Sequence, residues 1–152
     1  MLHQLLIGTA VTMACILISG LGFWLAEVVF TRRRDWLMEP PHRNKLFAVV
    51  GGAGALVLAV VLAGVTLWAA VFAALGMFAD FETAFYFALV SYTTVGYGDV
   101  VPAGERRILG AMAAANGFIN IGLLTTLLIE GLRYVREGYR RGLDGDGEDD
   151  ED

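Results

Sequence analysis

The sequence predicts an all-α membrane protein with three transmembrane helices and one short re-entrant helix. Hydrophobic residues make up 57% of the 152 residues, a composition too apolar for a soluble domain of this length. They gather in three long runs, each longer than the roughly 20 residues that a helix needs to cross a bilayer. The runs are residues 5–30, with Glu27 as the one charge, and residues 46–78 and 108–129, with none.

The first run, within residues 1–30, is predicted to be a retained transmembrane helix rather than a cleaved signal peptide. No Lys or Arg precedes it, it is longer than a signal-peptide core, and no small-residue cleavage pattern comes before Arg32. Cys15 is the only cysteine, so no disulfide can form within one chain. His3 and His42 stand far apart without other ligand residues, so we expect no metal cofactor.

Basic residues near the ends of the runs predict the topology. Short loops rich in Lys and Arg stay in the cytoplasm, whereas acidic residues carry little topological information. We therefore expect residues 31–45 to form a basic cytoplasmic loop of a multi-pass protein in the cell membrane, with the N-terminus outside and the C-terminus cytoplasmic. The residues that carry this bias are Arg32, Arg33, Arg34, Arg43 and Lys45 in the loop, and Arg133, Arg136, Arg140 and Arg141 after the last run.

Residues 79–107, between the second and third runs, are too apolar for a free loop. Asp80 is a favourable N-cap for a helix over residues 80–93, which spans only about 20 Å at 1.5 Å per residue. A Gly-rich, non-helical segment follows it. Such backbone is tolerated at membrane depth only where protein buries it or where it lines a water-filled path. The pattern therefore predicts a re-entrant loop that enters from the outer side.

The re-entrant loop carries the motif that points to a function. Its residues are Thr94, Val95, Gly96, Tyr97 and Gly98, followed by Asp99. Glycine at alternate positions accepts backbone angles that are closed to residues with a Cβ, so successive carbonyls can point towards one axis. Carbonyls in such a row replace the water around a dehydrated cation. The motif resembles the selectivity filter of pore-loop potassium channels.

The resemblance covers residues 46–134 and implies a potassium-channel pore domain. Its implied parts are an outer helix at 46–78, a pore helix at 80–93, a filter at 94–98 and an inner helix at 108–134. The helix at 1–30 and the basic loop at 31–45 lie outside it. Residues 135–152, which include seven acidic residues among the last nine, are expected to form a disordered acidic cytoplasmic tail.

The resemblance also implies how an ion is held. K⁺, the permeant ion, would bind at Thr94, Val95, Gly96 and Tyr97, and Asp99 would raise the cation concentration at the outer mouth. One strand cannot encircle an ion, so a homotetramer with cyclic symmetry is implied. The other expected partner is the lipid bilayer. We expect no enzyme activity, no nucleic-acid partner and no soluble ligand domain.

The inner helix supplies candidates for the cavity below the filter and for a gate. Gly117 is a hinge candidate by resemblance, but Gly also permits close helix contact in membranes, and both roles stay open. Asn116 and Asn120 lie four residues apart and share one face. That face either looks into a water-filled cavity or makes hydrogen bonds between helices. The full set is Asn116, Gly117, Asn120, Ile121, Gly122 and Thr125.

Two positions depart from the pattern of many family members. The pore helix has Tyr86 and Phe87 where many relatives have two tryptophans, and Phe87 cannot donate a hydrogen bond to Tyr97. Val90 stands where some relatives place a glutamate beside the aspartate that follows the filter. Asp99 therefore needs another partner, and Tyr86 is the candidate.

We therefore predict a subunit of a potassium-selective channel that conducts K⁺ passively. The alternatives are a weakly selective monovalent cation channel and a non-conducting accessory membrane subunit. The Gly-rich residues 51–54 superficially suggest a nucleotide-binding turn, but uncharged residues surround them and no strand precedes them, so small-residue packing is expected. Residues 32–34 are consecutive arginines rather than arginines spaced along an apolar helix, so they indicate topology and not voltage sensing.

Overall fold

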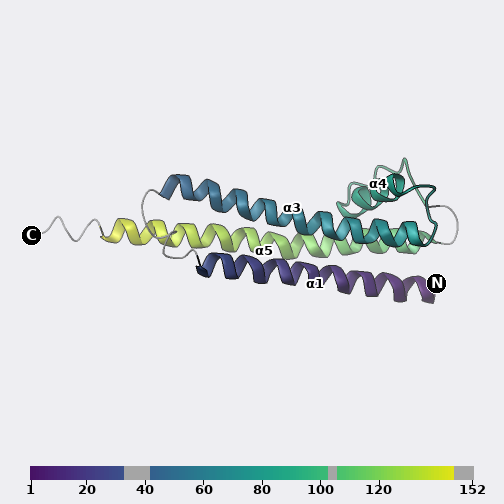
Figure 1. The fold of residues 1–152 in the computed structure, drawn as a ribbon, viewed down its shortest axis with the longest axis horizontal. Coiled ribbons are helices and arrows are strands. Elements are labelled where there is room, and N and C mark those ends of the chain that lie inside the picture. The colour runs from purple at the N-terminus through teal and green to yellow at the C-terminus, as the bar shows by residue number, and fades with distance from the viewer. Residues whose placement is uncertain (33–41, 103–105, 146–152) are drawn as a thin grey trace, which may run out of the picture.

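The computed structural model describes residues 1–32, 42–102 and 106–145, most of which lie in α-helices (Figure 1). The helices are α1 (Leu2–Arg32), α3 (His42–Ala74), α4 (Phe81–Tyr92) and α5 (Arg107–Gly145). The described residues contain no strand. Three stretches are long and apolar enough to cross a membrane, namely Leu2–Val29, Phe47–Ala74 and Arg107–Thr126. The predicted all-α membrane fold with three spanning helices is therefore confirmed.

The helix α3 starts and stops earlier than the expected range 46–78, and a glycine sets its end. Gly76 adopts a left-handed conformation with φ 62°. The Gly76 N–H donates to the Ala73 carbonyl at 2.9 Å, and the Met77 N–H donates to the Phe72 carbonyl at 3.0 Å. This pair of bonds is the Schellman motif, in which a left-handed glycine satisfies the last carbonyls of a helix. The chain can then turn directly into α4.

The short helix α4 begins where the sequence places an N-cap. The Asp80 carboxylate accepts a hydrogen bond from the Thr83 N–H at 2.7 Å and a second from the Thr83 hydroxyl at 2.9 Å. These bonds favour the ionised carboxylate and hold the pKa of Asp80 below its usual value. The helix has 12 residues, or about 18 Å of length, which is too short to cross a bilayer.

The helix α5 is longer than expected and corrects the predicted tail. The inner helix was expected over residues 108–134, yet α5 runs on to Gly145, so residues 135–145 are helical rather than disordered. The physical reason is local: five of these residues are good helix formers, and they outnumber the three glycines, which disfavour a helix. The five are Arg136, Glu137, Arg140, Arg141 and Leu143. Residues 146–152, and the expected basic loop at 33–41, lie outside the described part of the chain.

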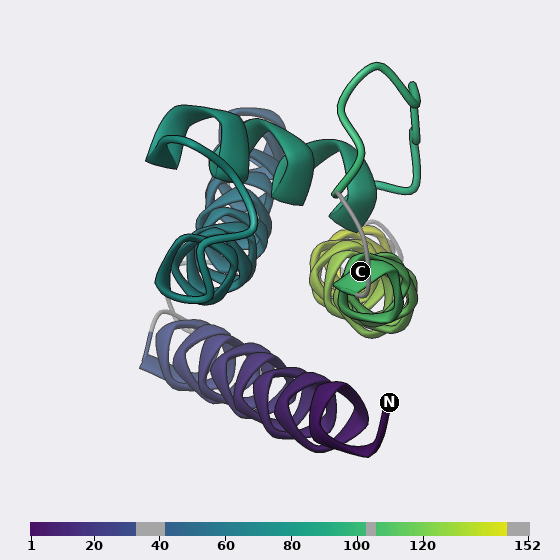
Figure 2. The same cartoon turned by 90° about the vertical axis from the view of Figure 1, so that its right-hand side faces the viewer.

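The spanning helices lie side by side, and α4 sits on one side of them (Figures 1 and 2). α1 and α5 run in the same direction and α3 runs in the opposite one, so Met1, the end of α3 and α4 gather at one end of the bundle. α1 packs against both α3 and α5, on the side opposite α4. α4, which precedes the candidate filter, contacts both α3 and α5.

An aromatic core fixes α4 to its neighbours. Phe72 of α3 is fully buried, and its ring centroid lies 5.5 Å from those of both Trp68 and Phe87. Phe78 packs on Phe87 at 5.0 Å. Gly110 of α5 lies against the Phe87 ring, because a Cβ added there would come within 2.9 Å of it. Phe87 of α4 therefore packs against both long helices that flank it.

Candidate functional site

The candidate filter has an alternating backbone. Thr94, Gly96 and Gly98 have φ values of 60°, 58° and 76°, whereas Val95 and Tyr97 between them do not have positive φ. Where residues alternate between left-handed and ordinary conformations, successive peptide groups rotate so that their carbonyls can point towards one axis. This is the geometry expected for a row of ion-binding carbonyls. The two glycines adopt these angles without steric cost. Thr94 does not, since a β-branched residue with positive φ is rare and strained by about 1–3 kcal/mol.

The end of α4 holds the start of the filter. The Thr94 N–H donates to the Ser91 carbonyl at 2.9 Å, and the N–H groups of Val95 and Gly96 both donate to the Val90 carbonyl at 3.1 and 3.2 Å. These bonds satisfy the last carbonyls of the helix, which have no partner within the helix itself. They also compensate the strain at Thr94. The filter backbone is therefore an extension of a helix that the aromatic core already fixes.

The filter residues are exposed in the single chain. Val95 is 52% exposed and Tyr97 is 73% exposed, so the chain covers only part of each side chain. One strand of carbonyls can contact a cation from one side only. K⁺ requires oxygen ligands all round it once its water is removed. The arrangement can bind an ion only when further carbonyl rows face this one. Among the described residues, no cluster of His, Cys, Asp and Glu could hold a metal.

Asp99, at the end of the filter, has the partner that the sequence suggested. The Tyr86 hydroxyl donates to Asp99 Oδ2 at 2.6 Å. This hydrogen bond holds the pKa of Asp99 below its usual range and raises the pKa of Tyr86. The predicted pairing is thus confirmed. The carboxylate stays ionised and carries its charge at the filter's end.

The inner-helix candidates fall on different faces of α5. Asn116 and Asn120 are fully buried, and the Ser19 hydroxyl of α1 donates to Asn120 Oδ1. The Asn120 amide donates to Asn116 Oδ1 at 3.0 Å. Of the two alternatives for this face, the single chain thus has hydrogen bonding between helices and not exposure. Ile121, Gly122 and Thr125 are exposed on another face.

Gly117 of α5 lies directly against the backbone at the end of α4. A Cβ added there would lie 1.7 Å from the Tyr92 carbonyl oxygen and 2.5 Å from its carbon. Only glycine permits this approach, so the packing role of Gly117 is present in the structure. The predicted hinge remains a prediction. The signal in the sequence was the glycine itself, but its partner Tyr92 could not be identified without the fold.

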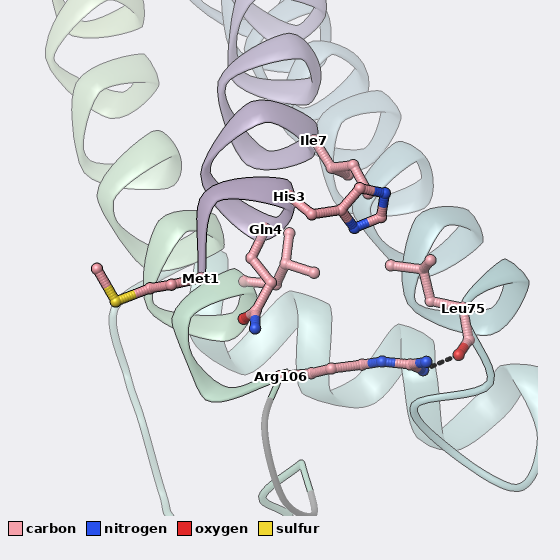
Figure 3. A pocket seen from close by; sticks show the side chains of 7 residues that line it. Met1, His3, Gln4, Ile7, Leu75 and Arg106 are labelled. Atoms are coloured by element: carbon pink, nitrogen blue, oxygen red, sulfur yellow. Dashed lines mark hydrogen bonds between the residues drawn. The ribbon is translucent and has the colours of Figure 1, made fainter.

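A cavity of about 250 Å³ lies at the end of the bundle near Met1, and no residue of the candidate filter lines it (Figure 3). The Arg106 guanidinium crosses its floor and donates to the Leu75 carbonyl at the end of α3. No role was predicted for Arg106 from the sequence, so this capping role was missed. The lining residues are Met1, His3, Gln4, Ile7, Leu75, Arg106 and Leu109, so no predicted site residue faces this cavity.

Comparison with known proteins gives matches over the part of the chain that holds these features. The family model described as "Ion channel" matches residues 48–134. Among curated proteins, the chain is 36% identical over 70 residues to "Potassium voltage-gated channel subfamily A member 2" of Oncorhynchus mykiss, covering 45% of this chain and 14% of that protein.

Two further relatives agree with this match. "Potassium voltage-gated channel protein shk-1" of Caenorhabditis elegans is 31% identical over 78 residues, covering 49% of this chain and 15% of that protein. "Shaker-related potassium channel tsha2" of Oncorhynchus mykiss is 38% identical over 58 residues, covering 38% and 12%. The chain thus aligns with only a small part of each curated relative. No solved structure matches it. The helix α1 lies outside the residues that the family model matches.

Proposed function

This chain belongs to the pore-loop potassium channel family, and we propose that it is one subunit of a homotetramer that conducts K⁺ passively across a membrane. The alternating backbone of Thr94, Gly96 and Gly98 carries the proposal. Four such strands would surround one axis with carbonyls of Thr94, Val95, Gly96 and Tyr97. Those oxygens replace the hydration shell of K⁺, so the ion enters the filter at little cost.

The tetramer is proposed because of what a single chain leaves uncovered. Val95 and Tyr97 project apolar surface beside the filter. On α5, Phe118 is 72% exposed and Ile119 is 46% exposed. Neighbouring copies related by a fourfold axis would cover the filter side chains and leave part of this α5 face to line the pathway. Closed cyclic symmetry gives each copy the same environment.

Asp99 would complete the site at its outer mouth. Its carboxylate is kept ionised by the Tyr86 hydroxyl, so a tetramer would carry a ring of four negative charges. Such a ring raises the local concentration of cations at the entrance. The charge also disfavours anions there. The ring therefore acts on the rate of ion entry, while the carbonyls act on the choice of ion.

The chain is a multi-pass membrane protein, and we propose an orientation for it. Met1 and the filter lie at one end of the bundle and α5 ends at the other (Figure 1). The arginine bias of the sequence assigns the second end to the cytoplasm. We further propose the division into a helix at 1–30, a basic loop at 31–45, a pore domain at 46–134 and a cytoplasmic segment at 135–152.

A weakly selective cation channel is the second candidate, because Phe87 of α4 cannot support Tyr97 with a hydrogen bond. Phe87, at the position of a hydrogen-bonding tryptophan in many relatives, is packed into the apolar core against Phe72 and Phe78. It has no group that could donate to Tyr97. The upper filter would then depend more on contacts between copies.

A flux measurement tests the proposal. The purified full chain is placed in liposomes, and the reversal potential is recorded in opposed gradients of K⁺ and Na⁺. We expect a potential near that of K⁺, and Tyr97→Asp should shift it towards zero because it alters the packing that holds the upper carbonyls. A wild-type potential near zero would favour the weakly selective alternative. Absence of flux from intact tetramers would reject conduction and favour an accessory subunit.

A further inference from the structure

A buried polar cluster joins α1 to the pore helix, although α1 lies outside the family-matched residues. Its members are Ser19 of α1, Asn116 and Asn120 of α5, and Tyr92 at the end of α4. Ser19 and Tyr92 are 1% exposed, and both asparagines are fully buried. Buried polar side chains are few among the described residues of the membrane helices, so the convergence of these four calls for an explanation.

The contacts within the cluster form a continuous chain. Ser19 Oγ lies in hydrogen-bonding contact with Asn120 Oδ1, and it also reaches the Cys15 carbonyl at 3.1 Å. The Asn120 amide donates to Asn116 Oδ1 at 3.0 Å, and the Asn120 side chain lies beside the Tyr92 hydroxyl. Asn120 is therefore the member that α1 and α4 share.

Tyr92 is held at both of its ends. Its hydroxyl lies over Gly64 of α3, where an added Cβ would come within 2.6 Å of the oxygen. Its backbone carbonyl lies against Gly117 of α5. Tyr92 is the last residue of α4 and stands two residues before Thr94, whose N–H is bonded to the preceding Ser91 carbonyl. A movement of the Tyr92 ring would thus be transmitted to the strained first residue of the filter.

The packing of α1 allows it to hold the cluster firmly. Gly8 of α1 lies against Met112 of α5, and Gly22 of α1 lies against Val60 of α3. α1 therefore contacts both long helices on either side of Ser19. In contrast, the Asn116 amide nitrogen has no hydrogen-bond partner among the described residues. A buried N–H without a partner costs free energy. A cluster that served only to anchor the helices to one another would therefore be more stable if this N–H were paired.

We infer that α1 positions the base of the selectivity filter through Ser19, Asn120 and Tyr92. These three are positioning residues, since none of them touches the ion. This inference rests on the proposed function and extends it, because it assigns a role in ion selection to a helix outside the pore domain. α1 would fix the Asn120 side chain, Asn120 would fix the Tyr92 hydroxyl, and Tyr92 would hold Thr94 in its left-handed conformation.

The test uses two variants that each remove a single hydroxyl from the full chain, Ser19→Ala and Tyr92→Phe. Thr66→Val is the matched control, because the Thr66 hydroxyl lies in a spanning helix but bonds only to the Leu62 carbonyl of its own helix. Reversal potentials in K⁺ and Na⁺ gradients give the permeability ratio, and the thermal midpoint of the tetramer is measured on the same preparations.

We expect each variant to lower the K⁺ to Na⁺ permeability ratio about threefold, the change that corresponds to one interhelical hydrogen bond. The double variant should lose less than the two single losses combined, since both act on Asn120. Thr66→Val should match the wild type. The inference would be overturned if tetrameric Ser19→Ala and Tyr92→Phe had unchanged permeability ratios. It would also be overturned if these two variants lost their tetramers while Thr66→Val kept them. In either case only an anchoring role would remain. A wild type without K⁺ flux would instead reject the proposed function.

Discussion

Gly117→Ala separates the packing role of this glycine from a hinge role. The new Cβ would lie 1.7 Å from the Tyr92 carbonyl oxygen, and ordinary contact begins at 3.4 Å, so this distance must double. The obstructing atoms belong to the backbone of α4 rather than to a flexible side chain, so α4 and α5 must move apart. Overpacking of this kind costs about 1–3 kcal/mol, and the higher helix propensity of alanine offsets about 1 kcal/mol of that.

Because the obstruction is backbone, the cost should lie at the upper end of that range, with a net loss of about 2 kcal/mol for each chain. The assay is the thermal midpoint of the detergent-solubilised tetramer, with K⁺ flux in liposomes measured alongside. Gly122→Ala is the matched control on the same helix, since nothing lies within 4 Å of a Cβ added to Gly122. It should retain or slightly raise the midpoint.

The outcomes distinguish the two roles. Packing predicts that Gly117→Ala lowers the midpoint well below that of Gly122→Ala. A hinge predicts altered conduction with a midpoint like that of the control, because alanine stiffens a helix without weakening it. If Gly117→Ala is as stable as the wild type, the close approach of Gly117 to Tyr92 is not what holds the two helices together, and the reasoning fails.

Three further predictions follow from the same contacts. Tyr86→Phe removes the hydrogen bond that depresses the pKa of Asp99, so protonation of Asp99 and the accompanying loss of K⁺ current should begin at a higher pH than in the wild type; a coincident pH profile would contradict this. Asp80→Ala removes the cap of α4 and should lower the thermal midpoint at neutral pH. The difference from wild type should vanish as the pH falls through the depressed pKa of Asp80, because the stabilising hydrogen bonds need the ionised carboxylate. Asn120→Asp should weaken tetramers without creating block by internal Mg²⁺, because the side chain is buried against α1; voltage-dependent Mg²⁺ block would place it in the pathway instead.

The features that sequence predicts well here are those governed by local chemistry. The length and apolarity of each run predict a spanning helix. The Asp80 cap and the glycines of the filter are equally local, because a side chain or its absence decides the backbone angles. The end of α3 could also have been read locally, since Gly76 occupies the position of a helix-closing glycine. The left-handed Thr94 is different, because only its bonds to the end of α4 compensate the strain.

The rotation of α5 shows what local pattern cannot decide. Two asparagines four residues apart define a polar face, but water and another helix satisfy amides equally well. The choice is made by α1, which contributes Ser19 at the level of Asn120 from a position about 100 residues away in the sequence. A polar face on an inner helix is therefore evidence for a cavity only when no other helix in the chain has a polar residue at the matching depth. Ser19, near the middle of α1, is that residue, and pairing it with Asn120 predicts both the packing of α1 against α5 and the face of α5 that α1 leaves uncovered.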